Sequence, residues 1–142
     1  MRNLTLNVKK KWFDMILENI KKEEYREIKD FSVVRCLEMD TKLAIGWGGG
    51  YKTPVSAFNY LVGLCGTRLG AVKCLLGTCA SFKEYDTVTF LNGMKKQTPT
   101  IIIECKGIEL GTAKPEWSNN LKGELFKIKV GDIIETRNCA VA

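Results

Sequence analysis

At 142 residues, with an ordinary apolar share, the chain is long enough for one domain with a proper core and short for two. Its net charge of +6 favours polyanionic partners such as RNA, DNA or phosphorylated nucleosides, although a basic protein without such a partner fits the charge equally well. The chain contains no histidine, which excludes Ser-His-Asp triads, histidine acid–base chemistry and histidine-containing metal sites.

Short strands and one early helix dominate the predicted elements. Residues 4–8 alternate apolar and polar side chains and predict a strand, and residues 10–18 carry apolar side chains at spacings of three and four, which predicts a helix. Further strands are expected at 23–29, 85–91, 100–109, 125–130 and 133–136, the last two split by Gly131-Asp132. Strands of this length and spacing favour an α+β fold with a small closed or partly closed β-barrel.

Residues 38–83 do not fit this pattern of strands and are interpreted as an insertion. Glycines at 46 and 48–50 predict a loop over residues 42–52. Residues 55–79 are apolar, but Arg68 and Lys73 in their middle would each cost about 2.5–3.5 kcal/mol at a bilayer centre. We therefore expect a helical or irregular excursion that packs on the barrel, and no membrane contact.

The most informative stretch is the charged segment at residues 19–29. A strand would sort its side chains onto two faces, with Glu24 and Arg26 on one and Tyr25 on the other. Because a half-buried strand seldom carries so many charges without partners, Lys21, Glu24 and Arg26 indicate a polar site on a rigid element.

The same stretch resembles the start of an ASCH domain, whose signature is G-x-K-x-x-E-x-R. The signature maps onto Asn19, Lys21, Glu24 and Arg26, and asparagine is the residue that best replaces glycine where φ is positive. Residues 107–111, 114–117 and 126–131 carry a second, weaker likeness. The chain is similar to small ASCH proteins of bacteria and their phages, which implies one PUA-like β-barrel over residues 1–142, with 38–83 as an atypical insertion.

The three charged residues of the motif could divide a binding or catalytic task. Arg26 offers a planar fork for a phosphate or a base edge. Lys21, if desolvated near another cation, could act as a base, and Glu24 could accept an exocyclic amine or hydroxyl, or orient a water.

Two branches of the ASCH family imply two different reactions. The branch that hydrolyses N4-acetylcytidine uses a threonine nucleophile beside the lysine, and this chain has Glu24 there, which counts against the same acyl transfer. The other branch contains metal-dependent ribonucleases, and Glu24 with Glu116 and either Glu104 or Glu109 could hold Mg²⁺ or Mn²⁺. No other cofactor is expected.

A second group of candidate residues is the run Lys114-Pro115-Glu116-Trp117. Trp117 could stack on an unpaired base, with Lys114 and Glu116 as polar neighbours, or it could close an open end of the barrel. Lys9, Lys10 and Lys95 would extend a basic rim of phosphate contacts.

The cysteines and the first residues bear on the compartment. Residues 1–5 contain no apolar signal region, so we expect the reducing cytoplasm. The chain has no C-x-x-C pair, so the spacing of its cysteines does not indicate a zinc site. We expect buried free thiols at the six positions, which are Cys36, Cys65, Cys74, Cys79, Cys105 and Cys139.

The sequence thus favours binding of RNA or a modified nucleobase in a cleft lined by Lys21, Glu24, Arg26 and Glu116. The alternative is a hydrolase, either a ribonuclease or an amidohydrolase on a modified cytidine. A third hypothesis is a phage-encoded module that binds a protein through residues 38–83.

Overall fold

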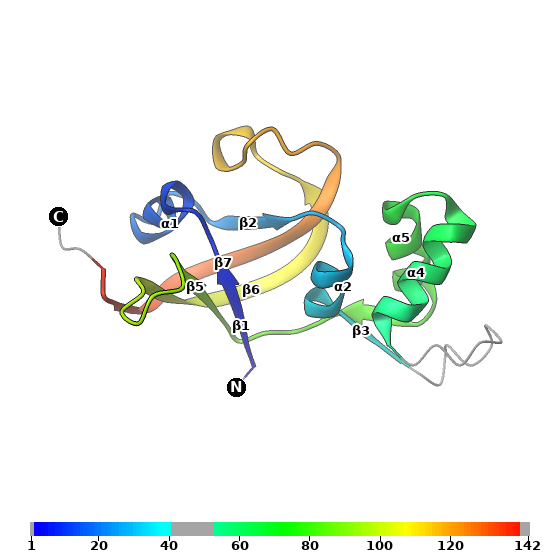
Figure 1. Cartoon of the computed structure of the whole chain (residues 1–142), viewed down its shortest axis with the longest axis horizontal. Helices are drawn as coiled ribbons and strands as arrows, with labels where there is room; N and C mark the ends of the chain where they lie inside the picture. Colours follow the sequence, from blue (N-terminus) through cyan, green and yellow to red (C-terminus); the bar gives the residue numbers. More distant parts are fainter. Residues whose placement is uncertain (1, 41–52, 140–142) are drawn as a thin grey trace.

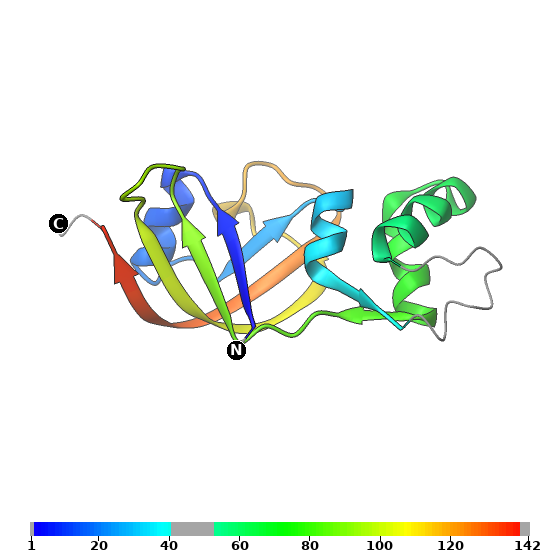
Figure 2. The ribbon, with the colours of Figure 1, turned by 60° about the horizontal axis from the view of Figure 1, so that its bottom comes forward.

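The computed structural model describes residues 2–40 and 53–139, and most of its strands belong to one curled sheet (Figure 1). The strand order is β1-β5-β6-β7-β2, with β1 and β5 parallel and the other neighbours antiparallel. The strands are β1 (Asn3–Asn7), β5 (Thr87–Leu91), β6 (Thr100–Thr112), β7 (Glu124–Arg137) and β2 (Glu23–Arg26). Figure 2 shows that the sheet bends into an open half-barrel.

A hydrogen bond joins the two edges of this sheet. Strands β1 and β2 lie at opposite ends of the strand order, yet Arg26 Nη2, at the end of β2, donates to Asn7 O, at the end of β1, over 3.0 Å. The long strands β6 and β7 supply the bend, because their register shifts at three places between Ile102 and Gly107. Gly107 has φ 128°, a conformation that side chains with a Cβ rarely adopt.

The core fills the hollow of the half-barrel. Helix α1 (Lys10–Leu17) buries Trp12, Phe13 and Ile16, the apolar residues spaced by three and four in the sequence. Alternate residues of the strands are buried in the same core, as the period of two in β1 shows. The fully buried strand side chains include Val88, Phe90, Ile101, Ile103, Phe126 and Ile128.

A helical unit stands at the other end of the molecule (Figure 1). It comprises α2 (Asp30–Cys36), β3 (Leu37–Met39), α4 (Pro54–Cys65), α5 (Arg68–Thr78) and β4 (Ala80–Phe82). Thr53 and Thr67 cap α4 and α5, each accepting a hydrogen bond from a backbone N–H of the first turn. Strands β3 and β4 pair, so the two ends of residues 38–83 lie together.

The structure confirms the α+β class and a barrel-like sheet, and it corrects several details. The expected strand at 23–29 ends at Arg26, and helix α2 follows, which was not predicted. The predicted break at Gly131-Asp132 is wrong, because β7 runs through it: the ladder with β6 absorbs the irregularity as a register shift. The excursion at 38–83 is helical as predicted, and the glycine-rich segment 42–52 lies outside the described residues.

Among the described helices, none is long and apolar enough to cross a membrane alone, while α4 and α5, bent by 120°, meet the length and composition requirement only as a pair.

All six cysteines are free thiols. Cys36 and Cys79 are buried as expected, Cys74, Cys105 and Cys139 are half-buried, and Cys65, the last residue of α4, is exposed, contrary to the prediction.

The bend at Gly107 can be tested with one matched pair of substitutions. A Cβ added at Gly107 or at Gly63 would meet no atom within 4 Å, so Gly→Ala acts at both sites through backbone conformation. We expect Gly107→Ala to lower the free energy of unfolding by about 1–3 kcal/mol, because its φ is positive. Gly63→Ala, inside α4, should raise it by about 0.4–1 kcal/mol. Urea denaturation measures both, and effects of the same sign would contradict the role given to Gly107.

Candidate functional site

The turn after α1, at residues 19–21, directs the side chain of Lys21 into the protein. Asn19 adopts φ 61°, a left-handed conformation that asparagine tolerates better than most residues with a Cβ. The backbone N–H groups of Ile20 and Lys21 both donate to Met15 O, at 2.9 and 3.1 Å. This tight reversal turns the side chain of Lys21 inward, beneath α1.

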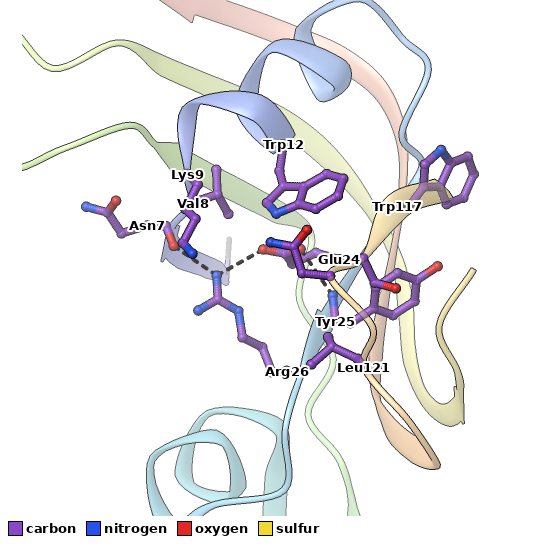
Figure 3. A pocket seen from close by; sticks show the side chains of 11 residues that line it. Asn7, Val8, Lys9, Trp12, Glu24, Tyr25, Arg26, Trp117 and Leu121 are labelled. Carbon is purple, nitrogen blue, oxygen red and sulfur yellow. Dashed lines mark hydrogen bonds and ion pairs between the residues drawn. The ribbon is translucent and has the colours of Figure 1, made fainter. Parts of the chain in front are cut away.

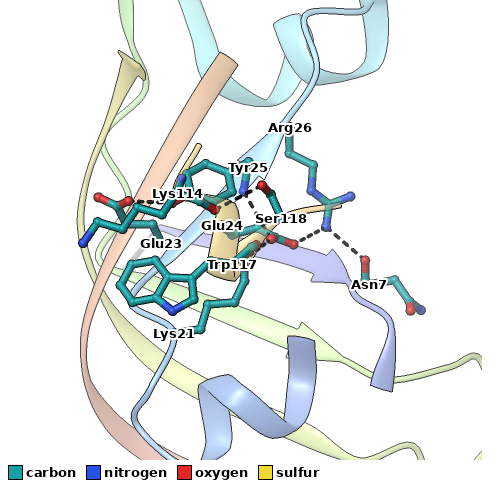
Figure 4. Close-up of polar contacts among 9 residues, drawn as sticks. All are labelled: Asn7, Lys21, Glu23, Glu24, Tyr25, Arg26, Lys114, Trp117 and Ser118. Atoms are coloured by element: carbon teal, nitrogen blue, oxygen red, sulfur yellow. Dashed lines mark hydrogen bonds and ion pairs between the residues drawn. The ribbon is translucent and has the colours of Figure 1, made fainter. Parts of the chain in front are cut away.

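Lys21 is among the largest fully buried side chains of the described residues, with 1% of its surface exposed. Its Nζ donates to Glu24 Oε1 and to Trp117 O, both at 3.0 Å (Figure 4). The ammonium group also lies 5.2 Å from the ring centroid of Trp12 and 4.9 Å from that of Tyr25. A carboxylate, a carbonyl and two aromatic rings therefore replace its water.

Glu24 stands between two cations. Its Oε1 accepts from Lys21 and from the backbone N–H of Tyr25, and its Oε2 accepts from Arg26 Nη2 at 3.0 Å. Arg26 uses the same nitrogen to reach Asn7 O, so the chain of contacts runs from Lys21 to the opposite edge of the sheet. The charges of the three side chains sum to +1. Lys21 and Glu24 are buried, and Arg26 is partly exposed.

Burial controls the protonation of this group. Desolvation lowers the pKa of Lys21 below its usual value, and the nearby Glu24 opposes this while Arg26 adds to it. The pKa of Tyr25 is raised, first by burial and then by the hydrogen bond that its hydroxyl donates to Glu23 at 2.7 Å.

The segment between β6 and β7 covers one side of the site. We call residues 113–123 the β6–β7 loop; it contains the short 3-10 helix η2 (Pro115–Trp117). The backbone N–H of Lys114 donates to Tyr25 Oη at 3.1 Å, and Trp117 O accepts from Lys21. The motif segment thus holds the loop at two points, through contacts between residues 89 and 96 positions apart in the chain.

A cavity of about 300 Å³ opens beside these contacts, between the ends of β1 and β2. Figure 3 shows the guanidinium of Arg26 between Asn7 and Glu24, with the ring of Trp12 above Glu24. Lys21 lies behind Glu24 and does not line the cavity. The lining residues are Asn7, Val8, Lys9, Trp12, Glu24, Tyr25, Arg26, Trp117, Ser118, Asn119 and Leu121.

The structure brings together some of the predicted site residues. Lys21, Glu24 and Arg26 form the contact chain described above, and Lys9 and Trp117 line the cavity. Lys114 contributes its backbone to the anchor of the loop, and its ammonium lies 4.4 Å from the centroid of the Trp117 ring.

Other predicted residues lie elsewhere. Glu116 is exposed on η2 and does not line the cavity, and its negative charge is one of the smaller causes that raise the pKa of Tyr25 in the motif. Lys10 pairs with Asp14 at 2.6 Å on the outer face of α1. Lys95 is exposed in the loop after β5 and does not line the cavity.

The predicted carboxylate set does not form a metal site. In residues 2–40 and 53–139, no three His, Cys, Asp or Glu side chains gather as metal ligands. Glu104 pairs with Lys106, and Glu109 with Lys127 and Lys129, on β6 and β7, and neither contacts Glu24. These carboxylates are apart because β7 lies between β6, which carries Glu104 and Glu109, and β2, which carries Glu24.

The sequence places Trp12 within the predicted helix at 10–18, and no pattern in it points to Asn7, Ser118, Asn119 or Leu121. Trp12 has the helical spacing of a core residue and is buried, yet part of it faces the cavity. Asn7 lies at the end of β1, where a polar residue at a strand end is the only local signal. The loop residues have no motif, because their position depends on the contacts with Lys21 and Tyr25.

Comparison with protein-family models, with curated proteins and with solved structures yields no match to this chain. The site is therefore interpreted from its own geometry.

The buried position of Lys21 makes Glu24 important for stability. Glu24→Gln removes the counter-charge of a buried ammonium, and we expect the free energy of unfolding to fall by about 3–5 kcal/mol at neutral pH. The matched control is Glu27→Gln, whose pair with Lys29 at 3.7 Å is more than half exposed; it should cost less than about 1 kcal/mol. Urea denaturation compares the two, and equal losses would mean that Lys21 does not depend on Glu24.

The titration of Lys21 should respond in opposite directions to its two charged neighbours. Glu24→Gln removes a group that raises the pKa of Lys21, so the pKa should fall further. Arg26→Met removes a group that lowers it, so the pKa should rise. The ¹³Cε chemical shift of Lys21 followed against pH measures all three proteins, and shifts in the same direction would contradict this account.

Proposed function

We propose that the chain binds an unpaired nucleobase of RNA, or a modified nucleobase, in the cavity between the ends of β1 and β2. The observation that carries the proposal is the wall formed by Glu24 and Arg26, which presents a carboxylate acceptor and a guanidinium donor side by side beneath an aromatic ring. Acceptor, donor and ring are the groups with which proteins recognise single-stranded bases.

The size and charge of the cavity support this ligand class. Its volume of about 300 Å³ is at the lower end for small-molecule sites, which suits one base or nucleoside better than a larger compound. Lys9 lies on its rim, and the net charge of the chain is +6, so a phosphate backbone would be attracted. Trp12 lines the cavity and offers part of its ring as a stacking surface for a base.

The likeness of Asn19, Lys21, Glu24 and Arg26 to the ASCH signature supports the same proposal. Two branches of that family act on RNA or on a cytidine. We extend the proposal to membership of the ASCH family and to a PUA-like form of the barrel. The curled five-stranded sheet and the left-handed Asn19 agree with that extension.

A hydrolase on a modified cytidine is the second candidate. The observation in its favour is the 3.0 Å contact between Lys21 Nζ and Glu24 Oε1, together with the lowered pKa of Lys21, which a general base requires. One observation favours binding alone: Lys21 does not line the cavity, so its amine does not face a substrate bound there.

Fluorescence anisotropy with a labelled single-stranded RNA tests the binding site. We expect Arg26→Ala to weaken binding at least about tenfold, because it removes charged hydrogen bonds to the base or phosphate. Arg26→Lys should restore little, since lysine lacks the planar fork. Arg137→Ala is the charge-matched control, because Arg137 is 61% exposed and lies outside the cavity. Equal losses for Arg26→Ala and Arg137→Ala would contradict the site.

The same samples separate the two candidate functions. RNA and N4-acetylcytidine are incubated with the protein, with and without Mn²⁺, and the products are analysed. Salt-sensitive binding without products supports a binding module. Deacetylation or cleavage that Lys21→Ala abolishes supports the hydrolase, and neither binding nor products would direct attention to α4 and α5 as a protein-binding surface.

A further inference from the structure

One wall of the cavity comes from a loop that the motif segment anchors. Trp117, Ser118, Asn119 and Leu121 belong to the β6–β7 loop and line the cavity. Tyr25 Oη accepts from Lys114 N at the start of this loop, and Lys21 Nζ donates to Trp117 O further along. The other hydrogen bonds within residues 113–118 are local, from Trp117 N to Lys114 O, Ser118 N to Pro115 O and Ser118 Oγ to Lys114 O.

Lys21 is placed to act through this loop. It is 1% exposed, it lies behind Glu24, and no part of it lines the cavity, so a ligand in the cavity meets Glu24 and the loop first. Its contact with Trp117 O is charge-assisted as long as the amine is protonated. When the Lys21 amine loses its proton, the Trp117 carbonyl loses this charge-assisted hydrogen bond.

We propose that Lys21 is a positioning residue of this site: its ammonium holds the Trp117 carbonyl, and thereby sets the β6–β7 loop as a wall of the cavity, without touching the ligand. For its ligand this inference rests on the proposed function, while the state of the loop is independent of any ligand. Tyr25 provides the second anchor, through an uncharged hydroxyl.

The protonation state of Lys21 then controls how firmly the β6–β7 loop is held. The charged groups that face the Lys21 amine are Glu23, Glu24 and Arg26 on the motif strand, with Tyr25 beside them and the Trp12 ring contributed by α1. Burial lowers the pKa of Lys21 and raises that of Tyr25, so Lys21 loses its proton first as pH rises. The protonated form holds the loop most strongly, and raising the pH through the Lys21 pKa weakens this hold, because the neutral amine is a weaker donor to Trp117 O.

Two variants separate the anchors. Lys21→Met fits the aromatic surroundings and removes only the charge and its donors, whereas Tyr25→Phe removes only the hydroxyl. We measure ¹⁵N heteronuclear NOEs of the Ser118, Asn119 and Leu121 amides at neutral pH, with residues of β5 as the rigid reference. We expect the loop NOEs to fall in both variants while those of β5 stay unchanged.

Binding of a labelled oligocytidylate is measured for the same proteins across pH, because cytosine has no ring N–H that ionises in the alkaline range. The affinity of the wild-type protein should fall as the pH rises, with its midpoint at the pKa of Lys21. That pKa is measured from the ¹³Cε chemical shift of Lys21. Lys21→Met should bind at least about tenfold more weakly at neutral pH and lose this pH dependence, whereas Tyr25→Phe should keep it.

Unchanged loop NOEs in Lys21→Met would overturn the inference. So would a loss of affinity without loop motion, because it would make Lys21 a ligand contact. If the wild type binds no RNA at any pH, the proposed function fails, and the NOE comparison still decides whether Lys21 positions the loop.

Discussion

The buried ammonium of Lys21 is the constraint on which the site depends. Removing a lysine from water is costly unless every donor finds a partner, and here the partners come from three parts of the chain: Glu24 on the motif strand, Trp117 O on the β6–β7 loop and the ring of Trp12 on α1. Because those partners must converge on one atom, the burial of Lys21 also fixes the helix, the strand and the loop relative to one another.

The open form of the sheet explains why the site lies where it does. A half-barrel leaves two edge strands with unpaired backbone groups, and side chains satisfy some of those on β1. Arg26 donates to Asn7 O, and Arg35 of α2 donates to Thr5 O. Strand β2, which carries Glu24 and Arg26, is itself the other edge of the sheet. Arg26 therefore joins the two edges of the sheet by a hydrogen bond and also lines the cavity, so edge protection and the proposed ligand binding would use the same side chain.

Much of the fold was readable from local patterns. The alternation in β1 and the helical spacing in α1 each followed one periodicity, and the positive φ of Asn19 agrees with the tolerance of asparagine for that conformation. Helix α2 was missed, because its short sequence follows a charged strand without a clear amphipathic stripe. The predicted break at Gly131 failed because pairing with β6 overrides a local turn signal.

For the candidate site, the sequence by itself determined which residues carry charge in one short segment and which faces of a strand they occupy. Strand geometry places Glu24 and Arg26 on the same side whatever the rest of the chain does. Only the tertiary structure decided that Lys21 lies behind the cavity, that Glu116 stays exposed, and that Trp12, Asn7 and the β6–β7 loop complete the walls. The physical reason is that the contacts of the loop join residues 89 and 96 positions apart, and their distances depend on how far the sheet curls, which no local pattern encodes.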